Sequence, residues 1–269
     1  MHIILKSALA AGAVIALPAL CGGLTTSRHI LRTGKLKKPV RLVLLSDLHE
    51  TRHGKGQNRL IRRIKAEVPD IILMAGDMLD EYRSFASAAE LLRGLADIPM
   101  FFVCGNHEYR VRNIGYHLAA MKKLGVNIMN DRHKTIEIKG QALLIAGADD
   151  PGRTRIQPGY IGAAAMKKSF SHLKDDGGLK ILLAHRPELI GRYAQYPFDL
   201  VVSGHAHGGQ IRIPFLNIGL YSHGEIFPKY SSGVHRIGKC RMAVSRGLSV
   251  FPLLPRIFNP PEIVSITLC

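Results

Sequence analysis

RLVLLSDLH, at residues 41–49, is the segment that indicates most about the architecture of this chain. Its apolar first half predicts a short buried strand, and Asp47 and His49 come directly after that strand ends. The pattern recurs where DIILM (70–74) leads into GDMLD and where PMFFVC (99–104) leads into GNHE. Buried strands that end in polar side chains are typical of open α/β sheets, whose sites lie outside the carboxyl ends of the strands.

The segments between and after these strands alternate between helical and extended patterns. The spacing of apolar residues predicts helices over 56–67, 84–96, 113–124, 160–173 and 187–195. Further strands are expected at 134–138, 142–147, 179–184, 199–203, 210–213, 233–237, 240–246 and 262–268. The βαβ order of the first half implies a largely parallel sheet with helices on its faces. We therefore expect one α/β domain over residues 39–269, with two sheets between helical layers.

Polar groups with metal-binding chemistry follow five of the predicted strands. They are DLH (47–49), GDMLD (76–80), GNHE (105–108), His185 and GHAH (204–207). Carboxylate, amide and imidazole groups together suit Mn, Fe or Zn. Two metal ions bridged by a carboxylate are a standard arrangement for hydrolysing phosphate esters. If the five strand ends meet in one cleft, the sequence predicts a di-metal site there.

The five groups, in this order, resemble the calcineurin-like metallophosphoesterases over about residues 40–268. The resemblance implies a four-layer α-β-β-α sandwich and two divalent metal ions, with Mn as the first choice and Fe, Zn or Mg as alternatives. It implies that Asp77 bridges the two ions. The ligands of one ion would then be Asp47, His49, Asp77 and His207, and those of the other Asp77, Asn106, His185 and His205.

The same resemblance assigns the remaining catalytic roles. A water or hydroxide between the ions would attack phosphorus, and His107 would contact the phosphate and protonate the leaving oxygen. Asp77 and His107 are therefore the catalytic candidates. Glu108 or Asp80 could orient His107, although Asp80 could equally be a helix cap. Arg110 is the best basic candidate for contact with a diphosphate, because it follows GNHE closely.

The last third of the chain resembles a membrane-linked bacterial branch of the family. That likeness rests on GHAHGGQIRIP (204–214), SRGLS (245–249) and RIFNPPEIVSITL (256–268). The branch includes phosphodiesterases and hydrolases of UDP-2,3-diacylglucosamine in lipid A synthesis. The resemblance implies hydrolysis of a phosphodiester or pyrophosphate bond in a phosphorylated, lipid-linked substrate. An apolar rim for the acyl chains is expected from Phe215, Leu216, Ile218, Phe251, Leu253 and Leu254.

The charge balance favours an anionic partner, because 37 Lys and Arg face 20 Asp and Glu, for a formal net charge of +17. Nucleic acid is disfavoured, since aromatic residues make up only 6%, Trp is absent and no separate binding domain is visible. A generic phosphodiesterase or nuclease acting on soluble phosphodiesters or nucleic acid remains the alternative. A phosphoprotein phosphatase fits less well, because GDMLD is followed by Glu81 where those enzymes carry Arg.

The amino-terminal region has a separate pattern. Residues 7–27 carry no charged side chain, which predicts an apolar anchor helix long enough to cross a bilayer. Five basic residues within 28–38 predict a stalk that contacts anionic lipid headgroups, so residues 1–38 are expected to form anchor and stalk. The positive-inside rule then places the catalytic domain on the cytoplasmic face of a bacterial inner membrane. A cleaved signal and an exported domain are the alternative.

Overall fold

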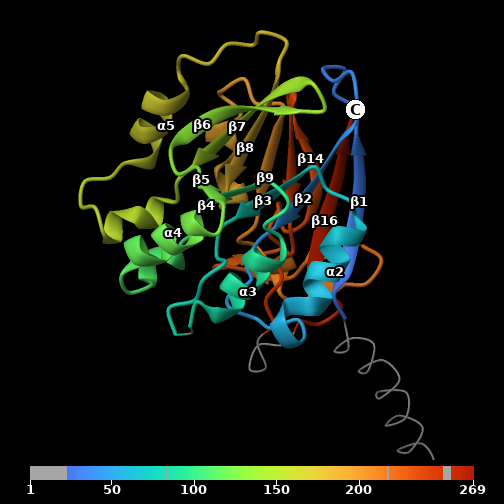
Figure 1. Ribbon diagram of the computed structural model, residues 1–269, viewed down its shortest axis with the longest axis vertical. Coiled ribbons are helices and arrows are strands. Elements are labelled where there is room, and N and C mark those ends of the chain that lie inside the picture. Colours follow the sequence, from blue (N-terminus) through green and yellow to red (C-terminus); the bar gives the residue numbers. More distant parts are fainter. Residues whose placement is uncertain (1–22, 83, 217, 251–255) are drawn as a thin grey trace, which may run out of the picture.

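The structure, a computed structural model, describes residues 23–82, 84–216, 218–250 and 256–269, and it contains two six-stranded sheets (Figure 1). The first sheet has the order β1 (Thr25–Leu31), β16 (Glu262–Leu268), β2 (Val40–Leu45), β3 (Ile71–Ala75), β4 (Met100–Val103) and β5 (Val126–Ile128). The second has the order β14 (Gly233–Ile237), β15 (Cys240–Val244), β9 (Leu200–Ser203), β8 (Leu179–Ala184), β7 (Gln141–Ala148) and β6 (Arg132–Ile138).

The helices and short turns connect these strands. The α-helices are α2 (Asn58–Ala66), α3 (Ala86–Gly94), α4 (Ile114–Lys123), α5 (Gly162–Phe170) and α6 (Ile190–Tyr193). Single 3-10 turns occur at Lys55–Gln57, Glu108–Arg110, Pro151–Arg155, Pro187–Leu189 and His207–Gly209. Two small hairpins follow the last of these turns, and they are made by β10 (Arg212–Ile213) with β11 (Ile218–Gly219) and by β12 (Tyr221–Ser222) with β13 (Glu225–Ile226).

The centre of both sheets is parallel, as the alternating order predicted. Strands β2 to β5 run parallel in the first sheet, and β7, β8, β9 and β15 run parallel in the second. Strand β16 joins β2 in the antiparallel direction. The carboxyl ends of the central parallel strands, at which the motifs lie, can therefore meet at one end of the sandwich.

Three apolar clusters account for the layers. One lies between the two sheets and includes Leu44 and Leu73 from the first sheet and Leu183 from the second. A second packs the first sheet against α2, α3 and α4, and a third packs the second sheet against α5 and α6. Each sheet thus buries both faces, which explains why the central strands are mostly apolar instead of alternating. The mixed α/β sandwich of two sheets is confirmed.

Gly147 of β7 marks how closely the sheets approach each other. A Cβ atom at this position would lie 2.5 Å from Cγ1 of Val103 and 2.6 Å from the carbonyl oxygen of Met129. We expect Gly147→Ala to lower the free energy of unfolding by about 1–3 kcal/mol, because backbone cannot move aside as a flexible side chain can. Urea denaturation measures this loss. Gly191→Ala is the control, because no atom lies within 4 Å of a Cβ there, and an equal loss in both variants would contradict the packing argument.

The predicted boundary at residue 38 is wrong, because part of the expected stalk belongs to the first sheet. Strand β1 pairs in parallel with β16, with Thr25 opposite Glu262 and Leu31 opposite Leu268. Basic side chains assigned to the stalk form ion pairs with the domain, including Arg28 with Glu67 at 2.5 Å. Strand β1 was missed because TTSRHIL has only a weak apolar pattern of its own.

The structure also corrects the predicted localisation at a bacterial inner membrane through one anchor helix. Among residues 23–82, 84–216, 218–250 and 256–269, no helix is long and apolar enough to cross a membrane. Most of the predicted anchor, up to residue 22, lies outside the described residues. Residues 25–27, at its end, belong to β1.

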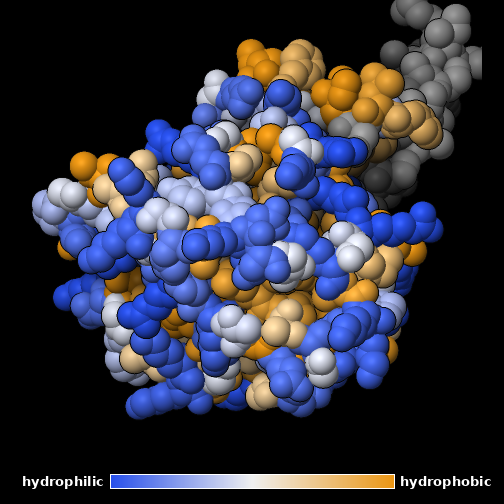
Figure 2. All heavy atoms as spheres, turned by 90° about the horizontal axis from the view of Figure 1, so that it is seen from above, coloured by the Kyte–Doolittle hydropathy of each residue, from blue (hydrophilic) through white to orange (hydrophobic). Residues whose placement is uncertain are grey.

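The excess of basic residues predicts a largely hydrophilic surface. On the face drawn in Figure 2, hydrophilic side chains cover most of the area, and hydrophobic ones form separate clusters. Several of the exposed apolar side chains come from the two small hairpins and their connections, among them Phe215, Leu216 and Ile226. A gathering of this kind is typical of an interaction surface.

Candidate metal centre

The five predicted motif groups converge where the central strands of both sheets end. Asp47 and His49 follow β2, Asp77 follows β3, and Asn106 and His107 follow β4. The second sheet contributes His185 after β8, and His205 and His207 after β9. Nearly all of these side chains are buried, with exposures of 6% or less for every predicted ligand except His207.

The backbone at the candidate ligands is unusual. Five of the seven have positive φ angles, between 44° and 67°, although none is glycine, and these are Asp47, His49, Asp77, His205 and His207. Left-handed backbone is uncommon outside glycine and costs free energy. Strain of this kind is often concentrated at functional sites, where the surrounding structure holds it in place.

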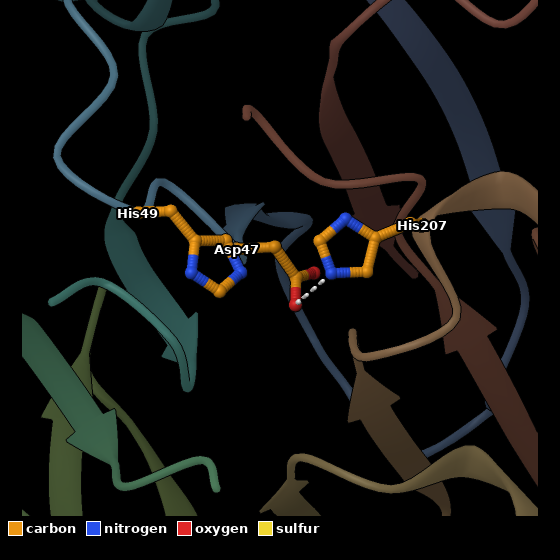
Figure 3. Close-up of side chains that lie close together, drawn as sticks. All are labelled: Asp47, His49 and His207. Carbon is orange, nitrogen blue, oxygen red and sulfur yellow. Dashed lines mark ion pairs between the residues drawn. The ribbon is translucent and has the colours of Figure 1, made fainter. Parts of the chain in front are cut away.

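Asp47, His49 and His207 form the first cluster (Figure 3). In Figure 3 the Asp47 carboxylate lies between the two imidazole rings, and its Oδ1 is 3.7 Å from Nε2 of His207. One candidate ligand atom from each of the three residues lies within 4.8 Å of the other two. Glycine at position 247 makes room for this arrangement, because a Cβ atom there would lie 2.8 Å from Cβ of Asp47.

Asp77, His185 and His205 form the second cluster, in which all three side chains are buried. Nε2 of His185 lies 3.2 Å from Oδ2 of Asp77, 3.1 Å from Nδ1 of His205 and 3.3 Å from Oδ1 of Asn106. Nδ1 of His185 donates a hydrogen bond to the carbonyl oxygen of Ala75 at 2.7 Å, because a carbonyl can only accept. This bond directs the unprotonated Nε2 toward the cluster when the imidazole is neutral.

Asp77 belongs to both halves of the site. Besides its contact with His185, its Oδ2 lies 3.7 Å from Nε2 of His49, which is part of the first cluster. Glycine at position 105 allows the approach, since a Cβ atom there would lie 2.8 Å from Nε2 of His185 and would also clash with the Asp77 carboxylate. The position of Asp77 is the one required of a carboxylate that bridges two ions.

The electrostatics of the cluster follow from burial and from the charges enclosed with it. Burial lowers the pKa of His49 to about 4 and lowers the pKa values of His205 and His207 well below the ordinary value. Burial also opposes the charged form of His185, but the Asp77 carboxylate outweighs it and raises the pKa of His185 to about 10. The same pair holds the pKa of Asp77 well below its ordinary value, in spite of burial.

The donor set fits two divalent cations. Neutral imidazole and ionised carboxylate are the forms that bind metal ions, and burial already keeps three of the histidines neutral. Carboxylate and amide oxygens are combined with imidazole nitrogens, and glycines leave room around them. The chain thus holds a candidate binuclear metal site, and the identity of the metals is a separate question.

His107 lies at the edge of this site, with its ring 4.5 Å from that of His49 in an edge-on arrangement. Its Nδ1 is 2.6 Å from Oε2 of Glu81, and its backbone N–H donates to Oδ1 of Asp77 at 2.9 Å. Arg110 contacts the same glutamate, with Nη1 3.5 Å from Oε1 of Glu81. Glu81 is therefore the residue that orients His107, a role that the sequence had suggested for Glu108 or Asp80.

Glu108 and Asp80 have other positions. Glu108 is fully buried and accepts hydrogen bonds from the backbone N–H groups of Asp77, Leu79 and Gly105, at 2.8 to 3.0 Å. Burial raises its pKa to about 8, with a further increase from the Asp77 charge, while the three N–H groups act in the opposite direction. Asp80 lies with Oδ2 3.7 Å from Nδ1 of His49 and accepts a hydrogen bond from the N–H of Tyr82.

Besides Glu81, three residues at the site were missed by reasoning from the sequence. Arg186 pairs with Asp150 at 2.7 Å, and its Nη1 lies 3.2 Å from Nε2 of His205. His223, on the β12–β13 hairpin, stacks on His205 with ring centroids 3.8 Å apart. Arg256 lies with Nη2 3.4 Å from Nδ1 of His207. Only Arg186 gave a usable signal, since it follows the ligand candidate His185 directly.

Comparison with known families decides what kind of protein has this site. The model of the calcineurin-like phosphoesterases matches residues 40–209, which include all five motif groups. The chain belongs to the calcineurin-like phosphoesterase family. This membership confirms the family predicted from the motifs, and with the candidate metal site it identifies residues 40–209 as a metal-dependent phosphoester hydrolase domain.

Individual members of the calcineurin-like phosphoesterase family show how far the similarity extends. The chain is 31% identical to a putative metallophosphoesterase of Caenorhabditis elegans, F40B5.2, in a match that covers 85% of this chain and 48% of the relative. It is 25% identical to the phosphodiesterase YaeI of Escherichia coli, covering 86% of this chain and 82% of YaeI. The chain spans only about half the length of the nematode relative, so whole-protein properties of that relative do not transfer directly.

Solved structures confirm the fold of a calcineurin-like phosphoesterase. The NAD nucleotidase of Haemophilus influenzae aligns with a TM-score of 0.52 at 16% identity, covering 79% of this chain and 46% of the nucleotidase. At that identity the similarity concerns the fold alone. The substrate of this chain has to be inferred from its own residues.

Proposed function

We propose that this calcineurin-like phosphoesterase uses two divalent metal ions to hydrolyse a phosphodiester or pyrophosphate bond. The observation that supports this most is the position of Asp77, whose Oδ2 faces His185 at 3.2 Å and His49 at 3.7 Å. When bound, the two ions supply Lewis acidity toward the phosphoryl oxygens and acidify the attacking water. The family resemblance favours Mn, and the mixed oxygen and nitrogen donors also suit Fe, Zn or Mg.

Each side chain of the site then has its own role. Asp47, His49 and His207 would hold one ion, His185, His205 and Asn106 would hold the other, and Asp77 would serve both. His107 carries a proton on Nε2 toward the leaving oxygen. Glu81 holds Nδ1 of the same ring at 2.6 Å and so keeps the ring in one orientation. The chemistry needs the leaving oxygen to be protonated because an alkoxide is a poor leaving group.

A diester is favoured over a monoester by the charge beside His107. Glu81 adds a carboxylate within hydrogen-bonding distance of the residue that would contact the phosphate. A monoester carries nearly two negative charges at neutral pH and a diester carries one, so the carboxylate repels the monoester more strongly. The relative YaeI is a phosphodiesterase, which agrees with this preference.

A lipid-linked substrate is the finer part of the proposal, with UDP-2,3-diacylglucosamine as the candidate. Three residues that were predicted to contact acyl chains are exposed, Phe215 and Leu216 at the connection between β10 and β11, and Ile218 at the start of β11. Phe251, Leu253 and Leu254 lie outside the described residues. The formal net charge of +17 favours a phosphorylated substrate and an anionic lipid surface around it. Nucleic acid is disfavoured as a substrate, because aromatic residues make up only 6% of the chain and Trp is absent.

Hydrolysis of matched substrates tests the proposal. With Mn²⁺ present, we expect kcat/KM for bis(4-nitrophenyl) phosphate to exceed that for 4-nitrophenyl phosphate by about tenfold or more, because the dianion is repelled. UDP-2,3-diacylglucosamine is compared with the same nucleotide sugar without acyl chains, and the acylated form is expected to have the lower KM. A preference for the monoester would contradict the diesterase assignment. Cleavage of DNA without any preference for the acylated substrate would favour the soluble phosphodiesterase or nuclease alternative.

A further inference from the structure

A cavity of about 360 Å³ lies beside the second cluster, and most of its lining residues are outside the family motifs. One wall is formed by Arg186 and His205, which follow the strands of the second sheet. The opposite wall comes from the β12–β13 hairpin and the residues after it, including Ser222, His223, Lys229 and Tyr230. The volume is close to the lower end of small-molecule sites, about 300–1,000 Å³, so one ring-sized group fits and a pair of acyl chains does not.

Arg186 is held so that one side of its guanidinium faces the metal centre. Nε and Nη2 both reach the carboxylate of Asp150, at 2.7 and 3.4 Å. Asp150 is itself buried and accepts a hydrogen bond from the N–H of Gly152 at 2.6 Å. Nη1 lies 3.2 Å from Nε2 of His205, and both Arg186 and His205 line the cavity. A guanidinium fixed in this way can bind a phosphoryl oxygen with little loss of side-chain entropy.

His223 covers the same histidine from the hairpin side. Its ring stacks on His205 with centroids 3.8 Å apart and an interplanar angle of 14°. Oγ of Ser222 lies 2.9 Å from its Nδ1, which fixes the ring orientation. The backbone of His223 has a φ of 47°, a conformation that is unfavourable for a residue with a side chain. The residue nevertheless stays exposed, so a bound group can reach its ring.

We propose that this cavity is the subsite for the second substituent of the phosphodiester, and that it takes a group of the size of one sugar or aryl ring. Arg186 binds a non-bridging oxygen of the phosphoryl group, and the His223 ring packs against the substituent. The inference rests on the proposed phosphodiesterase function. It adds a substrate class to that function: diesters with one compact ring on the side of the second cluster.

Two diesters with the same leaving group test the subsite. Methyl 4-nitrophenyl phosphate has a small second substituent, and phenyl 4-nitrophenyl phosphate has a ring. For His223→Ala we expect KM for the phenyl diester to rise about tenfold, with little change for the methyl diester, because only the ring packs against His223. His223→Phe should keep most of the affinity for the phenyl diester. His172→Ala, which removes a ring contact with His133 elsewhere, is the matched control.

Arg186→Ala should lower kcat/KM for both diesters about 100-fold, because both lose the same phosphoryl contact. Arg186→Lys should restore only part of the loss, since lysine keeps the charge but lacks the fork that pairs with Asp150. Arg192→Ala, an exposed arginine on α6, is the control and should leave both rates unchanged. Bound metal, measured by mass spectrometry, should equal that of the wild type in the Arg186 and His223 variants.

Equal KM changes for the two diesters in His223→Ala, or none, would overturn the subsite while leaving the diesterase function standing. Unchanged kinetics in Arg186→Ala, or a loss that merely follows loss of metal, would overturn the role of Arg186. If the wild-type protein hydrolyses neither diester with metal present, the proposed function and the inference both fail.

Discussion

Asp77→Asn is expected to lower kcat about 1,000-fold or more, because the loss of a carboxylate shared by two ions removes several kcal/mol of transition-state stabilisation. The amide that replaces it is neutral and cannot donate an oxygen to each ion with the same strength. Asp77 is only 1% exposed, and its carboxylate already contacts histidines of both clusters. We therefore expect the variant to bind less than the full complement of metal.

Metal content and steady-state kinetics, measured on the same preparation, check this result. Asp97→Asn is the matched control, because it makes the same chemical change at an exposed carboxylate that pairs with Lys65. It should keep full activity and full metal content. Circular dichroism should show both variants folded. Wild-type turnover in Asp77→Asn would rule out a bridging role for this carboxylate.

Much of the fold could be predicted because its central strands are buried on both faces. Mostly apolar runs such as LKILLA at 179–184 predict core strands, and β8 covers those six residues. Strand β1 could not be found this way, because it lies at the edge of the sheet and its side chains are mostly half-buried or exposed. Its pairing with β16 joins segments from opposite ends of the chain, which local patterns do not reveal.

The site could also be predicted only in part from the sequence. The candidate ligands sit at fixed positions after buried strands, so the motif order alone was sufficient to group them. The residues around the ligands are fixed by tertiary contacts instead. Glu81 was passed over in favour of Glu108, yet Glu108 points into the loops and holds three backbone N–H groups. His223 contacts His205 from a hairpin whose strands have two residues each, and no sequence pattern predicted this hairpin.

The localisation failed for a related reason. Uncharged residues 7–27 and the basic residues after them were interpreted together as anchor and stalk. In the structure two of these basic side chains form ion pairs with the domain, Arg28 with Glu67 and Lys35 with Asp199 at 2.8 Å. A run of basic residues on a chain with a formal net charge of +17 therefore says little about topology unless its partners are known.

His107→Ala should lower kcat about 100- to 10,000-fold, because a positioned proton donor contributes about that much to the transfer of a phosphoryl group from a poor leaving group. The metal content should stay unchanged, since His107 is not one of the seven candidate metal ligands. The loss should depend on the leaving group. It should be large for a phenol or sugar hydroxyl and small for 4-nitrophenol, which leaves without needing a proton.

Glu81 links this prediction to the geometry. Burial opposes ionisation of Glu81, but its hydrogen bonds, including the one to His107, outweigh burial and lower the pKa of the carboxyl. The carboxylate is therefore charged at neutral pH and holds Nδ1–H of His107. Glu81→Gln should lower kcat about tenfold or more, because it loosens the orientation of the imidazole. In the double variant with His107→Ala it should have almost no further effect, since the two residues act as one unit.

A series of aryl methyl phosphates with leaving groups of increasing pKa measures these effects. The loss of kcat in His107→Ala should increase as the pKa of the leaving group increases. The loss in Glu81→Gln should increase in the same direction, but less steeply. Glu90→Gln serves as the control, because it neutralises a glutamate that pairs with Arg52 at 3.1 Å outside the site. A loss that is the same for all leaving groups, or fully additive effects of the two substitutions, would show that His107 binds phosphate without donating the proton.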